Sequence, residues 1–327
     1  AADFEIYAVR WPVLPRVWGE GLLLIPSQGR NPIANVIAIP DADQTPEMIC
    51  GLVDGVCQES QFAATLAANG CRVLVPVLID RELKLRGRAT TTTREFLYRS
   101  AFELGRHLIG YEVQKTLALV DWFEQDSILE DLPIGVVGWG EGGMLALYAA
   151  ALDVRIDVAC VSGYFGPRES MWQQPIDRNV FGLLEQFGDA EIASLIAPRP
   201  LLVEIAPGPE LTLPSDGGAP AILKTPAAAE VRREVARANR LVGGLDRETC
   251  NLIEGGDRFL TANSLQELLV ALDIQGDFNR EGRDVEHLRP DFDPTSRAER
   301  QAQQIDDHNQ WLLSESSYVR EALSYTH

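Results

Sequence analysis

The sequence predicts an α/β protein with a mostly parallel central sheet that is covered by helices on both faces. Short apolar runs alternate along the chain with longer segments of helical periodicity, and each connection is long enough for a crossover. A buried-type strand at residues 134–139 also runs through a glycine-rich turn straight into a helix of small residues. In such sheets, ligands bind beyond the carboxyl ends of the strands, so a site is expected there.

The individual elements follow from the local patterns. Residues 1–40 alternate apolar and polar runs and predict an antiparallel lead-in of two or three strands. Further strands are expected at 34–40, 72–79, 134–139, 156–162, 199–205 and 248–254, and helices at 62–69, 110–125, 144–152, 227–241 and 264–272. Two connections stand out: 80–106, rich in Arg and Thr, is expected to cross the top of the sheet, and 163–190 fits a lid.

The chain divides into a large domain and a tail. Residues 1–275 can form one domain, and 276–297 are dense in charge and are expected to be a linker. Residues 298–327 regain a helical stripe that includes Ile305 and Trp311. Such a stripe must be buried on this domain, on a second copy, or on a further domain, so the tail allows a homo-oligomer or a two-domain protein.

Composition narrows the possible partners. The chain has 327 residues and a net charge of −19, which repels phosphate backbones and argues against nucleic acid. Its longest apolar runs are strand-sized, so no membrane span is predicted. The five cysteines lack metal-ligand spacing. The start, Ala1-Ala2-Asp3, is compatible with cleavage of an export signal, although any other chain boundary would leave the same end.

The turn after the central strand carries the strongest motif. Gly138-Trp139-Gly140-Glu141-Gly142 joins the strand to the helix. This layout matches the nucleophile elbow G-x-S-x-G, whose strained turn needs glycines. The middle position, where the elbow carries its nucleophile, is Gly140. The framework for acyl transfer is therefore predicted without its attacking oxygen.

Four segments together resemble the α/β-hydrolase superfamily, in particular the dienelactone hydrolase and acetyl xylan esterase-like branch. They are the elbow, the small-residue helix at 144–152, Val161-Ser162-Gly163-Tyr164-Phe165, and residues 197–202. The likeness covers roughly residues 30–275. It implies an α/β-hydrolase fold with a mostly parallel central sheet flanked by helices, here with a C-terminal helical extension. It also implies a Ser-Asp/Glu-His triad in this chain order.

The expected triad positions are only partly filled. The nucleophile position is the vacant Gly140. The acid is expected after a late strand, where Glu210 is the best candidate and Glu204 and Asp216 are alternatives. The histidine is expected after the last strand, where Asp257 stands instead. The absence of two triad members favours a natural site without a triad over a single disabling substitution.

Other residues could carry displaced chemistry. The resemblance implies an oxyanion hole made by the backbone N–H groups of Asp41 and Glu141, although the loop at Asp41 could equally be a simple polar turn. The Glu141 carboxylate has a simpler explanation in the first turn of a helix, where the dipole favours it. Ser162 could point into the cleft or make a local hydrogen bond. His107 precedes the elbow, whereas His287, His308 and His327 lie in the linker and tail.

A binding surface is also possible. A polar set before the elbow could clamp a carboxylate or a sugar acid: Arg94, Arg99, Arg106, His107 and Tyr111. The favoured alternative is structural ion pairing with Glu95, Glu103 and Glu112. Three aromatic side chains could give a sugar-stacking floor or serve core and lid packing: Trp139, Tyr164 and Trp172. Asp41, Asp43 and Asp257 could converge above the strand ends, but such loop carboxylates are usually solvated, so no metal and no cofactor are predicted.

Two functional hypotheses follow. The first is an esterase-related domain with a degraded triad that serves as a binding or structural module, or as half of a two-domain esterase. The second is an active carboxylic-ester hydrolase that uses a relocated nucleophile or a carboxylate-activated water. A small acyl or carbohydrate ester is the expected ligand in either case.

Overall fold

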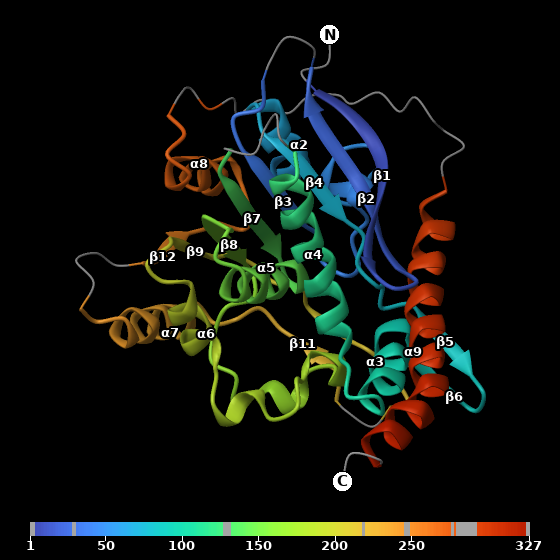
Figure 1. The fold of residues 1–327 in the computed structure, drawn as a ribbon. Coiled ribbons are helices and arrows are strands. Elements are labelled where there is room, and N and C mark those ends of the chain that lie inside the picture. The colour runs from blue at the N-terminus through green and yellow to red at the C-terminus, as the bar shows by residue number, and fades with distance from the viewer. Residues whose placement is uncertain are drawn as a thin grey trace.

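The computed structural model describes residues 4–27, 31–126, 132–217, 220–244, 249–275, 278 and 293–324. An eight-stranded sheet forms its centre, in the order β1-β2-β4-β3-β7-β8-β9-β12 (Figure 1). The strands of this sheet are β1 Phe4–Leu14, β2 Val17–Pro26, β3 Asn35–Ile39, β4 Arg72–Pro76, β7 Ile134–Trp139, β8 Val158–Ser162, β9 Leu201–Ile205 and β12 Cys250–Glu254. Strand β2 runs antiparallel to β1 and β4, and the other neighbours are parallel.

Two short hairpins lie outside this sheet. One pairs β5 (Leu83–Arg86) with β6 (Ala89–Thr92), and the other pairs β10 (Leu211–Thr212) with β11 (Ile222–Leu223). The first hairpin and helix α3 (Thr93–Phe102) make up most of the segment predicted to cross the sheet.

Helices cover both faces of the sheet and create two apolar cores. On one face lie α4 Leu108–Glu124, α5 Glu141–Leu152, α6 Asp189–Ile196 and α7 Ala228–Leu241, and on the other lie α2 Phe62–Ala68 and α8 Ala262–Ala271. Helix α1 (Pro46–Ile49) follows β3. Single turns of 3₁₀-helix occur at η1 Gln58–Ser60, η2 Met171–Gln173, η3 Ile176–Arg178 and η4 Leu183–Glu185. Three of these turns form the predicted lid.

The predicted fold class is confirmed. Each strand expected from the apolar runs is present; the inner strands are buried between two helical layers, and the edge strand β12 is half-buried. Strand β3 pairs in parallel with β4 and β7, so the antiparallel lead-in consists of β1 and β2 only. Residues 1–3 and most of the predicted charged linker (276–277 and 279–292) lie outside the described residues, as do His287 and His327.

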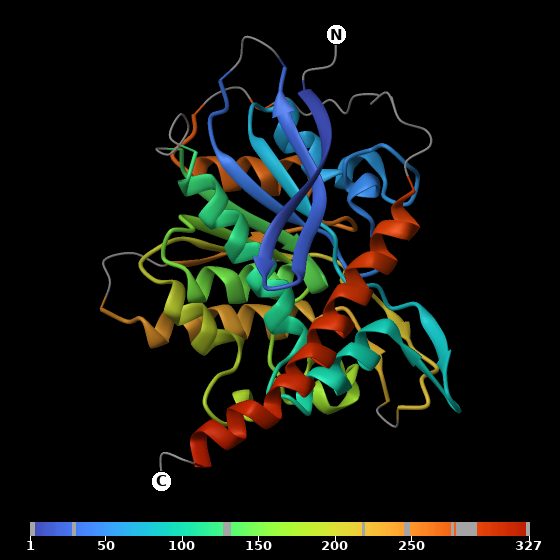
Figure 2. The same ribbon diagram turned by 45° about the vertical axis from the view of Figure 1, so that its right-hand side comes forward.

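The last helix, α9 (Pro294–Ser324), begins earlier than the predicted start at 298 and packs against β2 and α3 (Figure 2). Ile305 is fully buried there. Polar contacts flank it, including Arg297 with Glu47 at 2.8 Å and Lys115 with Gln301 at 2.5 Å. Part of the predicted stripe is thus buried on this domain itself. None of the described helices combines the length and apolarity needed to cross a membrane.

The parallel register brings several chain segments to one edge of the sheet. The segments after β3, β7, β8 and β9 begin near Asp41, Gly140, Gly163 and Ala206. Because neighbouring parallel strands end at the same edge, loops that are distant in the sequence meet there. The candidate site is built from them.

Candidate functional site

The elbow between β7 and α5 has the backbone of a sharp, strained turn. Gly140 has φ 58° and ψ −116°, a combination open to glycine but costly for other residues. A Cβ at Gly142 would overlap the backbone oxygen of Ile39, so α5 can lie directly against the sheet only because this position is glycine. The predicted strand–turn–helix is therefore present, with Gly140 at its apex.

The Asp41 carboxylate lies where a nucleophile would project from the elbow. Its Oδ1 accepts a hydrogen bond from the backbone N–H of Glu141 at 2.8 Å. A Cβ built on Gly140 would lie 2.5 Å from Asp41 Oδ1 and 3.0 Å from Pro209 Cδ. The other expected oxyanion-hole donor, the N–H of Asp41, is directed to Gln44 Oε1 at 3.1 Å. Both predicted donors are thus engaged by side chains of the protein itself.

Arg81 holds this carboxylate in place. Its Nη1 lies 2.5 Å from Asp41 Oδ2 and 2.8 Å from Asp43 Oδ2, and its Nη2 lies 3.2 Å from Asp41 Oδ1. Burial by itself would raise the pKa of the Asp41 carboxyl, but the charge and hydrogen bonds of Arg81 outweigh burial and lower it to about 2. Asp41 is therefore an anion at neutral pH and occupies the place of an oxyanion.

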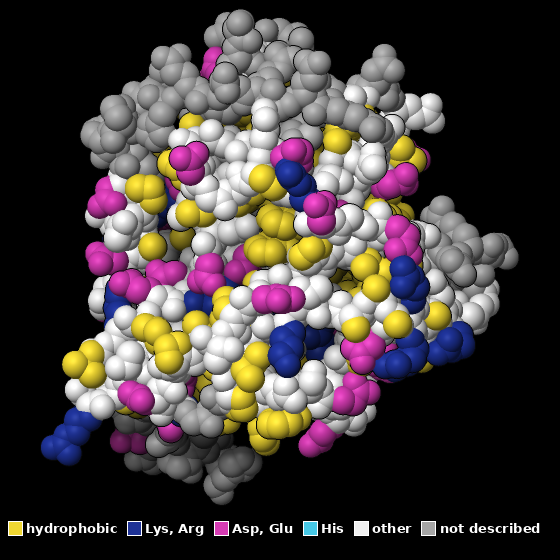
Figure 3. Space-filling view, turned by 180° about the vertical axis from the view of Figure 1, so that it is seen from behind, with side chains coloured by type: hydrophobic (Ala, Val, Ile, Leu, Met, Phe, Trp, Pro, Cys, Tyr) yellow, Lys and Arg dark blue, Asp and Glu magenta, His cyan; other side chains and the backbone are white. Residues whose placement is uncertain are grey.

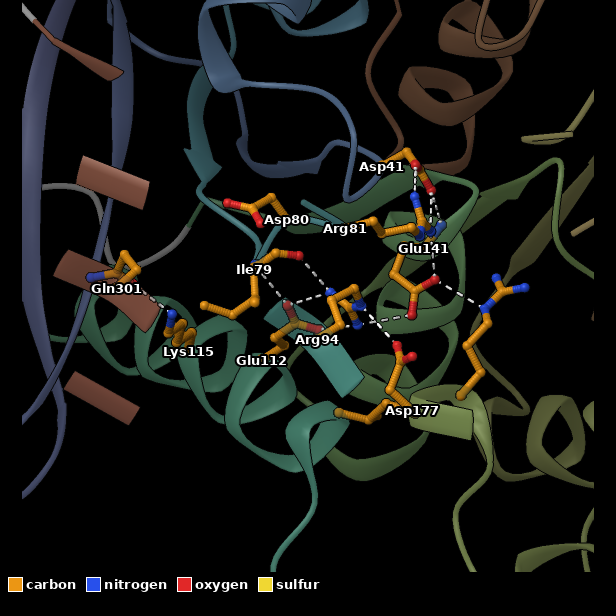
Figure 4. A network of polar contacts seen from close by, with 12 residues as sticks. Asp41, Ile79, Asp80, Arg81, Arg94, Glu112, Lys115, Glu141, Asp177 and Gln301 are labelled. Atoms are coloured by element: carbon orange, nitrogen blue, oxygen red, sulfur yellow. Dashed lines mark hydrogen bonds and ion pairs between the residues drawn. The ribbon is translucent and has the colours of Figure 1, made fainter. Parts of the chain in front are cut away.

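Glu141 extends the contacts into a buried ionic network. Its carboxylate meets Arg81 at 3.0 Å, Arg94 at 3.0 Å and Arg178 at 2.9 Å. Burial opposes its ionisation, but the neighbouring Arg178, followed by the other arginines, keeps the pKa of Glu141 below its ordinary value. The helix dipole alone is therefore not the whole explanation for this residue, since its side chain organises three arginines (Figure 4).

Arg94 is a fully buried member of the network. It pairs with Glu112 through two hydrogen bonds of 2.9 Å, bonds the backbone oxygen of Ile79 at 2.8 Å, and meets Asp177 at 2.9 Å. In this geometry its donors are satisfied inside the protein, as the ion-pair interpretation of the sequence predicts. Buried charges without such partners would be strongly destabilising.

Ser162 and Glu204 form a second buried pair. Ser162 Oγ donates to Glu204 Oε2, which also accepts the N–H of Leu260 at 2.8 Å, and Ser264 donates to Oε1. Burial, partly offset by these hydrogen bonds, raises the pKa of Glu204. Ser162 has no exposed surface. The pair connects β8, β9 and the segment leading into α8.

The remaining triad positions lie on exposed loops. Glu210 is exposed just beyond Pro209, and Asp257 is exposed after β12. Asp216 accepts the N–H of Thr90 at 2.7 Å. Nearby, Trp139 stacks on Phe259 with ring centroids 4.1 Å apart, and its indole N–H donates to Pro207 O at 2.7 Å. These contacts fasten the loops after β9 and β12 to the elbow strand.

Several residues of the predicted polar set have their contacts away from the elbow. His107 caps α4 by accepting the N–H of Ile109 at 3.1 Å, and its other ring nitrogen is 3.1 Å from Asn179 O. Arg99 pairs with Glu95 at 2.8 Å, and Arg106 is exposed. Tyr111 donates to Asn309 of α9 at 2.7 Å. The structure therefore does not gather these side chains around the Gly140 apex.

A cavity of about 320 Å³ opens next to the elbow, between the lid segment and the hairpin β10–β11. Its lining includes Tyr164, Arg168 and Arg178 from the lid side, and Pro209 and Lys224 from the other. Trp172, also on the lid, is 68% exposed. Of the three predicted stacking residues, Tyr164 alone is among the residues lining this cavity.

Sequence reasoning missed the side chains that fill the elbow. Asp41 was predicted for its backbone N–H and as one of three loop carboxylates above the strand ends, but not as the group beside the Gly140 apex, and Arg81 and Arg178 were not singled out. Arg81 does lie just beyond the end of a buried strand, a position that could have indicated it. Arg178 sits in a lid of irregular structure, where periodicity gives no signal. Within the described residues, no group of His, Cys, Asp and Glu is arranged to hold a metal ion.

Comparison with known sequences gives a partial match. No protein-family model matches the chain. A segment of 139 residues, 40% of the chain, is 31% identical to the candidate hydrolase YtaP of Bacillus subtilis (strain 168). This match spans 44% of that protein, so it covers less than half of the relative's length.

Solved structures share the architecture over most of the chain. A candidate acetyl xylan esterase from Bacteroides fragilis NCTC 9343 matches with a TM-score of 0.59 at 14% identity, covering 84% of this chain and 75% of that one. Methylesterase BT1017 matches with a TM-score of 0.54 at 17% identity, over 82% of this chain and 55% of that one. The glucuronoyl esterase of Solibacter usitatus matches with a TM-score of 0.51 at 13% identity, over 83% and 81%. At these identities the likeness concerns the fold: the chain has the α/β-hydrolase fold.

Proposed function

We propose that this chain is an esterase-related domain that has lost Ser-His-Asp turnover and serves as a binding or structural module. The observation that carries the proposal is the Asp41 carboxylate, which accepts the Glu141 N–H at 2.8 Å and lies beside the Gly140 apex. A carboxylate there repels a second oxyanion and takes the donor that would stabilise it.

Acyl transfer needs a nucleophile, a base and free oxyanion donors. Here the apex has no side chain, and Asp257, a carboxylate, stands where the histidine is expected. Loss of a nucleophile or its base removes about 10⁶ of turnover in a triad hydrolase, and loss of one oxyanion donor about 10²–10³. Together these losses leave no efficient route to a tetrahedral intermediate.

The domain organisation belongs to the same proposal. We take residues 1–275 as the hydrolase-like unit and α9 as an extension packed on it, joined by the charged segment. Because 82% of this chain matches only 55% of methylesterase BT1017, a further domain or a second copy that works with this unit is part of the proposal. A small acyl or carbohydrate ester is the ligand class that the names of the structural neighbours favour.

Two assays test the loss of turnover. Purified protein is incubated with a fluorophosphonate probe and, separately, with p-nitrophenyl acetate and an acetylated xylo-oligosaccharide. We expect no covalent labelling and no ester cleavage above the protein-free background, with Ser162→Ala assayed in parallel. Labelling or cleavage that disappears in Ser162→Ala would overturn the proposal in favour of a relocated nucleophile, and cleavage that persists would point to a carboxylate-activated water.

A single substitution should not restore the enzyme. In Gly140→Ser, the new Cβ would meet Asp41 Oδ1, and the described residues place no imidazole at the elbow. We expect ester turnover to stay at background in Gly140→Ser and in Gly140→Ser/Asp41→Gly, measured with p-nitrophenyl acetate. The Asp41→Gly variant alone is the matched control. Rescue by a factor of 10³ or more in Gly140→Ser would show that a base is present and that the proposal is wrong.

A further inference from the structure

The cavity beside the elbow differs in charge from the protein around it. Three cationic side chains and one carboxylate line it: Arg168, Arg178, Lys224 and Glu230. The chain as a whole has a net charge of −19. On the back of the molecule, basic side chains gather at a few places among widely scattered acidic ones (Figure 3). A cavity that collects positive charge in such a protein needs an explanation.

The two arginines are fixed by partners that lie behind the lining. Arg168 pairs with Asp189, and Arg178 pairs with Glu141; neither carboxylate is among the residues that line the cavity. Both guanidinium groups also lie over the ring of Tyr164, at 3.9 Å and 5.2 Å from its centroid. The arginines are therefore rigid, and binding would cost little ordering of these side chains.

Each arginine keeps donor capacity on the cavity side. Arg168 uses Nε and Nη2 for its hydrogen bonds. Arg178 donates a hydrogen bond from Nη1 to Gln174, and its Nε forms an ion pair with Glu141 without hydrogen-bond geometry. Within the described residues, Nη1 of Arg168 and Nη2 of Arg178 have no hydrogen-bond partner. Lys224, across the cavity, is exposed and forms no ion pair with the described residues. Two planar guanidinium edges and one ammonium group suit a carboxylate.

The rest of the lining suits hydroxyl groups. Gln173 and Ser170 present amide and hydroxyl groups, while Pro209 and Pro226 supply compact apolar walls. Amides and hydroxyls both donate and accept hydrogen bonds, so they match a polyol better than an apolar acyl chain. The volume of about 320 Å³ lies at the small end of ligand pockets.

We propose that this cavity binds a small hydroxylated carboxylate, such as a free sugar acid, with the carboxylate held by Arg168, Arg178 and Lys224. Arg178 joins this cavity to Glu141 and therefore to the ionic network beneath the elbow. The inference names the ligand class for the proposed binding role. It rests on the proposed function in one respect only, namely that the bound ligand is not cleaved.

Isothermal titration calorimetry of the full chain with sodium D-glucuronate tests the proposal. D-glucose, which has a hydroxymethyl group in place of the carboxylate, is the neutral match, and inorganic phosphate tests whether any anion suffices. We expect glucuronate to bind at least tenfold more tightly than either comparison ligand. Equal binding of phosphate would overturn the sugar-acid assignment, and equal binding of glucose would overturn the role of the carboxylate.

Variants locate the binding event. Lys224→Glu should weaken glucuronate binding at least tenfold, and Ser170→Trp should weaken it by filling the cavity without a change in charge. The control is Lys84→Glu, which makes the same charge change at a half-buried lysine of β5 that pairs with Glu82 and lines a different groove. Both cavity residues are exposed, so the variants should fold. Unchanged binding in both variants, or no glucuronate binding by the wild type, would refute the proposal; ester cleavage would refute only the loss of turnover.

Discussion

At the residue scale, the ionisation of the Asp41 carboxylate beside the elbow affects the stability of the fold. The folded-state pKa of Asp41 is about 2, below the value of about 3.9 for an unfolded aspartate. A carboxyl with a lowered pKa stabilises the fold above its unfolded pKa, and this stabilisation is lost as the pH falls through the folded pKa. The pairing of Asp41 with Arg81 therefore contributes on the order of 2 kcal/mol above about pH 4 and loses it towards pH 2.

The substitution Asp41→Asn should reveal the pH range over which the pairing with Arg81 stabilises the fold. The variant keeps the shape but loses the charge opposite Arg81, so we expect a lower urea midpoint than the wild type at pH 7. The difference should shrink between about pH 4 and pH 2, where the wild-type carboxyl becomes protonated. Asp43→Asn is the control, because Asp43 contacts the same Arg81 with a side chain that is 45% exposed. A difference between Asp41→Asn and the wild type that is constant with pH would contradict the assignment.

Glu204 should behave in the opposite way. Its pKa is raised by burial, so its contribution to stability is greatest at low pH and is lost as the pH rises through the folded pKa. In Glu204→Gln, the amide oxygen can replace Oε2 as acceptor for Ser162 and Leu260, and the amide nitrogen can donate to Ser264. We expect the urea midpoint of this variant to equal or exceed that of the wild type at pH 7 and to lose this advantage near pH 4.

Glu204→Ala provides the comparison for that variant. It leaves three buried donors without an acceptor and should lower stability by about 2–4 kcal/mol. If Glu204→Gln were as unstable as Glu204→Ala at pH 7, the ionised carboxylate itself would be required.

At the scale of single residues, the sequence could identify the vacant apex, because glycine is visible in a motif. It could not identify Asp41 as the occupant, since that depends on a side-chain rotation at the end of another strand.

At the scale of elements, hydrophobic periodicity predicted the strands whose side chains form the core. Strands β3, β4, β7 and β8 are apolar because both faces are buried, and that signal is strong in the sequence. Helix α3 and the hairpin β5–β6 were missed. Helix α3 has buried polar residues, among them Arg94 in the ionic network and Glu95, which contacts Arg99 and Ser215, so its apolar stripe is weak. Tertiary ion pairs, which a periodicity argument does not include, determine its position.

Helix α9 offers a direct test of packing. Ile305 is fully buried against α3 and α4, whereas Leu313, farther along the same helix, is 55% exposed. Truncation of a buried isoleucine removes transfer energy and leaves a cavity, so Ile305→Ala should lower the free energy of unfolding by about 2–4 kcal/mol. Leu313→Ala should change it by less than about 0.5 kcal/mol. Urea titration of the full chain measures both, and equal effects would mean that α9 does not dock as the structure shows.

At the scale of the whole molecule, buried charges are paired with one another, whereas most of the net negative charge is exposed. Three arginines lie in a buried network with four carboxylates: Arg81, Arg94 and Arg178 with Asp41, Glu112, Glu141 and Asp177. These contacts are buried and are screened little by salt. The net charge of −19 therefore resides mainly in exposed carboxylates, whose mutual repulsion opposes the compact state.

Salt should therefore stabilise this protein. An increase in NaCl from about 10 mM to about 300 mM shortens the screening length from about 30 Å to below 8 Å and weakens the surface repulsion, while the buried pairs are nearly unaffected. We expect the Tm at pH 7 to rise by about 2–5 °C, measured by differential scanning calorimetry. KCl at equal ionic strength is the control, because screening by 1:1 salts depends on ionic strength and not on the cation. A fall in Tm with both salts would mean that solvent-accessible ion pairs, rather than surface repulsion, dominate the electrostatic stability. The arginine networks would then have to be open to water, in conflict with the buried geometry around Glu141.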